Sequence, residues 1–164
     1  MLDARIVIIP FLLQVVCMGV DELYFHRKRS LPRWERLGHP LDTLTVLLCM
    51  IWLLFVPPTA QAIVVFIVLS TFSCFFITKD ERIHQRHCPA GEHWLHAVLF
   101  MLHPIILIAA AALWPAVHGQ PSAWLYYTGF ERFFMYSSTF LIFLFGLYQF
   151  IYWNLLWKPR SRNK

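Results

Sequence analysis

Charged side chains are scarce in this sequence, and that shortage is the first guide to its class. Asp, Glu, Lys and Arg together make up 14% of the 164 residues, whereas 59% of the residues are hydrophobic. A soluble domain is closer to one-quarter charged and one-half apolar. The aromatic content of 17% suits lipid-facing surfaces and interfacial belts. The composition therefore predicts an integral membrane protein.

Several chemical signatures are also missing. The four cysteines form no Cys-x-x-Cys pair, so the sequence indicates no disulfide framework. No Gly-rich phosphate loop and no Gly-x-Ser-x-Gly motif occurs, which leaves serine and cysteine hydrolysis without a strong candidate. The net charge is +5, but the basic residues lie in short patches beside apolar runs. This placement indicates membrane orientation and contact with anionic lipid rather than nucleic-acid binding.

Apolar runs close to the length of a membrane span occur five times. They cover residues 6–20, 41–56, 60–78, 94–114 and 133–157. About 20 apolar residues cross a bilayer as a helix, so the first two runs are expected to extend into the flanking polar segments. The break VPPTAQ is too short for anything but a tight hairpin. We predict a single all-α transmembrane domain of two helical hairpins and a closing C-terminal helix, followed by a basic tail at residues 158–164.

Lys and Arg lie almost entirely in three polar segments. These segments are the connection after the first apolar run, the connection after the third, and the C-terminal tail; only Arg5 and Arg132 lie elsewhere. An odd number of spans puts the three segments on one side, and the positive-inside rule makes that side cytoplasmic. We therefore expect a multi-pass protein of the bacterial inner membrane, with the N-terminus outside and the C-terminus in the cytoplasm.

Nearly all the acids and histidines gather in or beside the first and third polar connections. Both connections open with Asp-Glu and later contain Glu-x-x-x-His, which is a faint internal repeat. Ionisable groups at membrane depth are costly and indicate function by default. The candidate metal ligands are Glu22, His26, Glu35, His39, Asp42, Asp80, Glu81, His84, His87, Glu92, His96 and His103.

Carboxylates and imidazoles in this set are spaced for shared binding. Four pairs are four residues apart: Glu22–His26, Glu35–His39, Asp80–His84 and Glu92–His96. In a helix each pair lies on one face, with Cβ atoms about 5–6 Å apart, so both side chains reach one ion. Imidazole with carboxylate is the ligand set of iron, zinc and manganese. We expect two transition-metal ions, with iron favoured and zinc or manganese as the alternatives.

Local context separates stronger ligand candidates from weaker ones. His39 precedes Pro40, which disfavours a helical backbone there. His103 is expected about 10 Å deeper than His96 on the same helix face, at a kink before Pro104. Cys88 is a weaker, soft-ligand candidate. Ordinary ion pairs with nearby Lys and Arg would also explain four acids, namely Asp21, Glu22, Asp80 and Glu81.

This ligand set is similar in its logic to membrane fatty-acid hydroxylases and desaturases, which hold two irons in cytoplasmic histidine clusters at helix ends. Their His-x-x-His-His boxes are absent here. The Glu-x-x-x-His spacing also differs from the Glu-x-x-His of ferritin-like bundles. We predict a di-iron-type membrane oxidoreductase that acts on a lipid or quinone-like substrate at the cytoplasmic face. The alternative is a metal or proton transporter, or a membrane assembly factor. Either function is compatible with a partner membrane protein or with a second copy of the chain.

Overall fold

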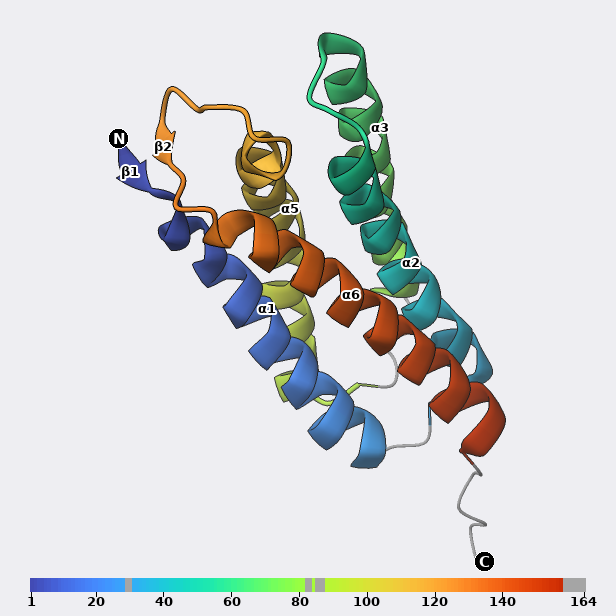
Figure 1. Ribbon diagram of the computed structural model, residues 1–164. Helices are drawn as coiled ribbons and strands as arrows, with labels where there is room; N and C mark the ends of the chain where they lie inside the picture. Colours follow the sequence, from blue (N-terminus) through green and yellow to red (C-terminus); the bar gives the residue numbers. More distant parts are fainter. Residues whose placement is uncertain (29–30, 82–83, 85–87, 158–164) are drawn as a thin grey trace, which may run out of the picture.

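Five long helices make up most of the molecule in a computed structural model (Figure 1). The structure describes residues 1–28, 31–81, 84 and 88–157. The helical spans are Ala4–His26, Arg33–Phe55, Ala60–Lys79, Ala90–Val117 and Phe130–Leu156. Each span is long and apolar enough to cross a membrane, which indicates a multi-pass membrane protein. The prediction of an all-α chain with five such helices is confirmed, and the predicted tail at 158–164 lies outside the described residues.

The regular helices within these spans are joined to shorter turns. They are α1 (Ile9–Val20), α2 (Arg33–Phe55), α3 (Ala60–Phe76), α5 (Ala90–Val117) and α6 (Phe130–Ile151). Turns of 3-10 helix precede α1 at Ala4–Ile8 and follow α3 at Ile77–Asp80. Turns of π-helix follow α1 at Asp21–His26 and α6 at Tyr152–Leu156. Two short parallel strands, β1 (Leu2–Asp3) and β2 (Leu125–Tyr126), pair beside the N-terminus.

Neighbours in space are not always neighbours in the sequence. The main partner of α1 is α5, whereas α2 packs against α6 and α3. The tight hairpin predicted from VPPTAQ is present between α2 and α3. The arrangement differs from two sequential hairpins because α1 places its polar end against the start of α5, which joins the two polar connections.

Pro40 lies inside α2 rather than before it, which corrects the expectation that His39 leaves the helix. The helix begins at Arg33, well before the apolar run. A proline in a helix leaves the carbonyl four residues earlier without its amide donor. That carbonyl belongs to Arg36, and Asn154 Nδ2 donates a hydrogen bond to its oxygen at 2.9 Å. The π-helical turn after α6 thus supplies the missing donor. The helix α5 likewise continues through Pro104.

The two ends of the bundle differ in character. At the end that carries β1 and β2 (Figure 1), buried apolar side chains such as Leu53 and Leu113 pack closely. Trp114 Nε1 donates to the carbonyl of Val56 at 2.7 Å, and His118 Nε2 donates to the carbonyl of Leu53 at 2.9 Å. We call this the apolar end. The polar end, where α1 and α6 finish and α2 and α5 begin, holds most of the acids and histidines.

Candidate metal centre

A π-helical turn at the end of α1 directs two side chains to one point. Asp21 and His26 are five residues apart, and a π-helical turn, with its bonds from i to i+5, stacks such residues on the same face. Asp21 Oδ2 lies 3.2 Å from His26 Nε2, and both residues are buried. An α-helical spacing pairs His26 with Glu22, and that predicted contact is present as well. For this reason Glu22, and not Asp21, is among the ligands predicted from the sequence.

Asp21 and His26 meet Glu92 and His96 from the start of α5. One ligand atom from each of these four buried residues lies within 4.8 Å of the others. His96 Nε2 is 3.2 Å from Asp21 Oδ1, and His26 Nε2 is 3.8 Å from Glu92 Oε1. Two carboxylates with two imidazoles are a set that iron, zinc and manganese accept. We call these four residues the first metal group.

A second set of ligand atoms lies beside the first. Glu35 from α2, His84 and Cys88 offer a carboxylate, an imidazole and a thiol within 4.8 Å of one another. His84 Nε2 is 3.6 Å from Glu35 Oε1, and the Glu35 side chain is fully buried. We call these three residues the second metal group. Cys88 belongs to the second metal group, although the only sign of this in the sequence is its position next to His87.

Two histidines connect the metal groups. His84 Nδ1 and His96 Nδ1 are 3.0 Å apart, and the ring centroids are 4.3 Å apart. One of the two nitrogens donates and the other accepts, so the neutral rings hold complementary tautomers. If His96 Nδ1 donates, His96 Nε2 has a free lone pair and can bind an ion in the first metal group. The proton of neutral His84 is then on its Nε2, beside Glu35. The opposite tautomers favour the second metal group, so the two groups are chemically linked, and ions bound to both Nε2 atoms at once would require this Nδ1–Nδ1 hydrogen bond to break.

His39 stands between the two metal groups. Its ring stacks on His84 with centroids 6.3 Å apart and lies 4.7 Å from the ring of His26. His39 Nε2 is buried and has no hydrogen-bond partner among the described residues. Because an unsatisfied buried nitrogen is costly, this atom is available as an additional ligand.

Glu22 contacts the first metal group through His26. Its Oε2 lies 3.3 Å from His26 Nδ1, and Trp153 Nε1 donates to its Oε1 at 2.5 Å. A carboxylate on the second nitrogen of a ligating histidine fixes both the tautomer and the ring orientation. Glu22 is therefore placed to orient His26, and Trp153 connects α6 to the centre.

Other predicted ligands lie outside both metal groups. Asp42 pairs with Lys79, whose Nζ is 2.5 Å from Asp42 Oδ1. His103 Nε2 shares a 2.9 Å hydrogen bond with the hydroxyl of Ser73, which in turn bonds Thr45 at 2.7 Å. Glu81 is half-buried and belongs to neither group. The side chain of Asp80 and the whole of His87 lie outside what the structure describes.

A cavity of about 740 Å³ runs from the metal groups into the bundle. Asp21, His84 and His96 line it at the polar end, and Phe11 and Phe134 line it at the far end. Cavities that bind small molecules are typically about 300–1,000 Å³. The volume of this one therefore suits a small-molecule ligand in contact with both metal groups.

The same cavity, which we call the lateral cavity, is open on one side of the bundle. The lining residues Leu12 and Val15 of α1 are 57% and 67% exposed, and Leu141 of α6 is 61% exposed. Exposure at lining positions means that the opening lies between α1 and α6, on the face that lipid would cover. No pattern in the sequence predicts the lateral cavity, because the two helices that form its mouth are separated by most of the chain.

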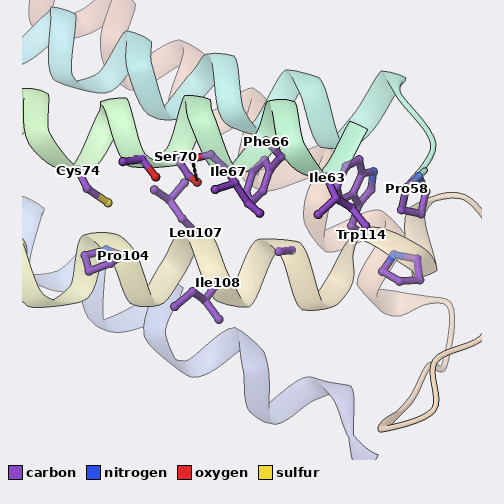
Figure 2. Close-up of a pocket in the computed structure, with 13 residues that line it drawn as sticks. Pro58, Ile63, Phe66, Ile67, Ser70, Cys74, Pro104, Leu107, Ile108 and Trp114 are labelled. Atoms are coloured by element: carbon purple, nitrogen blue, oxygen red, sulfur yellow. Dashed lines mark hydrogen bonds between the residues drawn. The ribbon is translucent and has the colours of Figure 1, made fainter. Parts of the chain in front are cut away.

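A second cavity, of about 500 Å³, lies between α3 and α5 (Figure 2). Figure 2 shows Phe66, Ser70 and Cys74 on one side of it and Pro104 and Leu107 on the other. No His, Asp or Glu is among the described residues that line it. This cavity is therefore separate from the candidate metal centre.

No protein-family model, curated protein or solved structure matches this chain. The fold and the polar end define the class as a multi-pass helical membrane protein with buried groups that could hold metal ions. The geometry of the polar end is the basis for any finer assignment.

Asp21→Ala is expected to weaken Zn²⁺ binding more than Glu22→Gln, because Asp21 offers a ligand oxygen and Glu22 acts through His26. Loss of an orienting partner costs about 10–100-fold in affinity, which sets the size of the Glu22→Gln effect. Competition titration of purified, metal-stripped protein measures both. Asp42→Ala is the matched control, since Asp42 pairs with Lys79 outside the groups. Equal losses for Asp21→Ala and Asp42→Ala would contradict the assignment of the first metal group.

Proposed function

We propose that this protein is a membrane-embedded oxidoreductase with a di-iron-type centre that hydroxylates or desaturates a lipid or quinone-like substrate. The observation that carries the proposal is that the two linked metal groups line one end of a cavity open to the lipid face. A soluble substrate would not need that opening. An apolar substrate can enter through it without leaving the bilayer.

The donor atoms fit a pair of transition-metal ions. Asp21, Glu35 and Glu92 are buried beside imidazoles in an otherwise apolar bundle, where a low dielectric strengthens the attraction of carboxylates for a cation. Bound cations in both groups would balance these charges. Carboxylates and imidazoles with one thiol suit iron, and zinc and manganese are the alternatives.

Bound iron would supply dioxygen activation. Hydroxylation of a C–H bond consumes one dioxygen, two electrons and two protons, and it yields an alcohol and water, so a reduced electron carrier is required as a partner. The chain's own residues hold the ligands, orient His26 through Glu22 and keep water from the reacting carbon with the apolar walls of the lateral cavity. His39, between the metal groups, is placed to hold or pass a proton.

The orientation follows from charge. Basic residues flank the polar end, among them Arg27, Lys28 and Arg33. The positive-inside rule puts such segments in the cytoplasm. The centre would then lie at the cytoplasmic face of a bacterial inner membrane, with the N-terminus and the apolar end on the outer side.

Topology reporters test this orientation. A fused reporter that works only in the cytoplasm is expected to be active at the C-terminus and inactive when inserted after Gly119, in the connection between α5 and α6. Expression levels of both fusions, measured by immunoblot, are the control. The reverse pattern of activity would place the metal groups on the outer side.

Metal analysis tests the centre itself. Protein purified in detergent is expected to carry about two transition-metal ions per chain, because the two groups offer separate donor sets. The double variant His84→Ala, His96→Ala is expected to lose both ions, since His96 belongs to the first metal group and His84 to the second. His118→Ala, at the apolar end, is the control and keeps them. A folded wild-type protein that holds no metal and takes none up on reconstitution would refute the centre.

Transport is the alternative function, and one observation favours it. The hydrogen-bonded row His103, Ser73 and Thr45 extends polar groups deeper into the bundle than the metal groups. The cavity between α3 and α5, which reaches the apolar end, has no charged residue or histidine in its described lining, and this speaks against a polar path through the whole membrane.

Cysteine labelling at His103 separates the two functions. In a background without native cysteines, the His103→Cys thiol is expected to react with a membrane-impermeant reagent added from the cytoplasmic side only, because the apolar side chains beyond it exclude water. Labelling by peptide mass spectrometry in sealed vesicles of both orientations provides the measurement. Reaction from the outer side would favour transport and contradict the oxidoreductase.

A further inference from the structure

We infer that the lateral cavity binds a single-chain amphiphile, with its polar end at the metal groups and its chain pointing toward Phe11 and Phe134. This inference rests on the proposed function for the reaction that follows binding. It deepens that function by naming the substrate class and by placing the reacting carbon near the polar end of the chain rather than at its terminal methyl.

The length of the lateral cavity matches one leaflet of a bilayer. Along α1 its lining extends from Asp21 to Phe11, and along α5 from His96 to Ile106. Each stretch spans about 15 Å at 1.5 Å per residue. The hydrocarbon core of a bilayer is about 30 Å thick, so one leaflet accounts for about half of it. The lateral cavity thus begins at the level of the polar end and stops near the middle of the bundle.

The polarity of the lining sets the direction of the ligand. Ionisable side chains line the cavity from the polar end as far as His103, about 10 Å beyond His96 along α5, and no lining residue beyond His103 is ionisable. That far part is lined mostly by apolar side chains such as Phe11, Ile106 and Phe134. Burying a headgroup among the apolar side chains would be costly, whereas an acyl or isoprenoid chain gains free energy there. A lipid of the adjoining leaflet has its polar headgroup and its apolar chain in the same order along the membrane normal.

Two contacts bound the mouth between α1 and α6. At the far end, the rings of Phe11 and Phe134 meet edge to face with centroids 5.2 Å apart. At the polar end, Trp153 hydrogen-bonds Glu22. The opening is therefore a slot between two closed points, and the volume of about 740 Å³ lies within the range of about 300–1,000 Å³ typical of pockets that hold one small ligand, to which we assign a single chain.

Gly19 provides a direct means of blocking the slot. It lines the lateral cavity, and a Cβ atom added to it would meet no heavy atom within 4 Å. A large side chain at this position would extend into the space assigned to the ligand. Val16, three residues earlier on α1, is 62% exposed and does not line the cavity, so it offers a matched control on the same helix.

Photo-crosslinking tests position and direction together. Two probes are used: palmitic acid with a diazirine at the terminal carbon, and palmitic acid with a diazirine next to the carboxyl group. The terminal probe is expected to label peptides that contain Phe11, Ile106 and Phe134, and the carboxyl-proximal probe to label Met18–Glu22. Peptide mass spectrometry locates the labels, in both metal-loaded and metal-stripped protein.

The Gly19→Trp variant is expected to lose about tenfold in labelling yield, because the indole fills the slot, and Val16→Trp is expected to keep wild-type labelling. Exchange of the two labelling patterns would overturn the direction. Equal labelling of wild type and Gly19→Trp would show that the probes sit in the surrounding lipid, and would overturn the site. Competition by a two-chain phosphatidylcholine as strong as that by palmitate would overturn the single-chain assignment.

The labelling experiment tests the lipid site independently of the metal centre in the proposed function. Correct labelling in a protein that binds no metal would support the lipid site and refute the metal centre. A metal-loaded protein whose lateral cavity takes up neither probe would support the metal centre and refute this inference.

Discussion

The structure depends on keeping several carboxylates buried at one end of an apolar bundle. Asp21, Glu35 and Glu92 come from three different helical segments and lie out of solvent. Isolated burial of such groups is prohibitive, so each needs a partner. Asp21 contacts His26 of its own turn, and three contacts cross between segments: His96 with Asp21, His26 with Glu92 and His84 with Glu35. The contacts between these carboxylates and imidazoles hold the end of α1 against the start of α5 and set the geometry of the polar end.

Departures from regular helix make that geometry possible. The π-helical turn after α1 turns Asp21 toward His26, and the π-helical turn after α6 brings Trp153 to Glu22. Pro40 leaves a carbonyl that Asn154 satisfies. π-helical turns are rare and concentrate at functional sites, because they cost stability that regular helices would keep. Here both of them contact the candidate metal centre directly.

The contrast between the two ends has a functional meaning. Close apolar packing and the bonds from Trp114 and His118 hold the apolar end together, whereas the polar end leads into the lateral cavity between α1 and α6. A one-sided site with a lipid-facing mouth fits chemistry on a membrane-borne molecule better than passage across the membrane. The cavity between α3 and α5 has no ionisable lining among the described residues and takes no part in this.

The sequence by itself determined the five helical spans and the pool of ligands, because apolar runs and the spacing of charges are local properties of the chain. Periodicity along one α-helix identifies neighbours at i+3 and i+4, and it therefore selected Glu22 for His26. Only the tertiary structure decided that Asp21 faces His26, that Cys88 joins Glu35, and that Asp42 pairs with Lys79 instead. Likewise, nothing local reveals the lateral cavity, since its walls come from helices at opposite ends of the chain. Which helices meet depends on the packing of side chains far apart in sequence, and no pattern within a single segment records that.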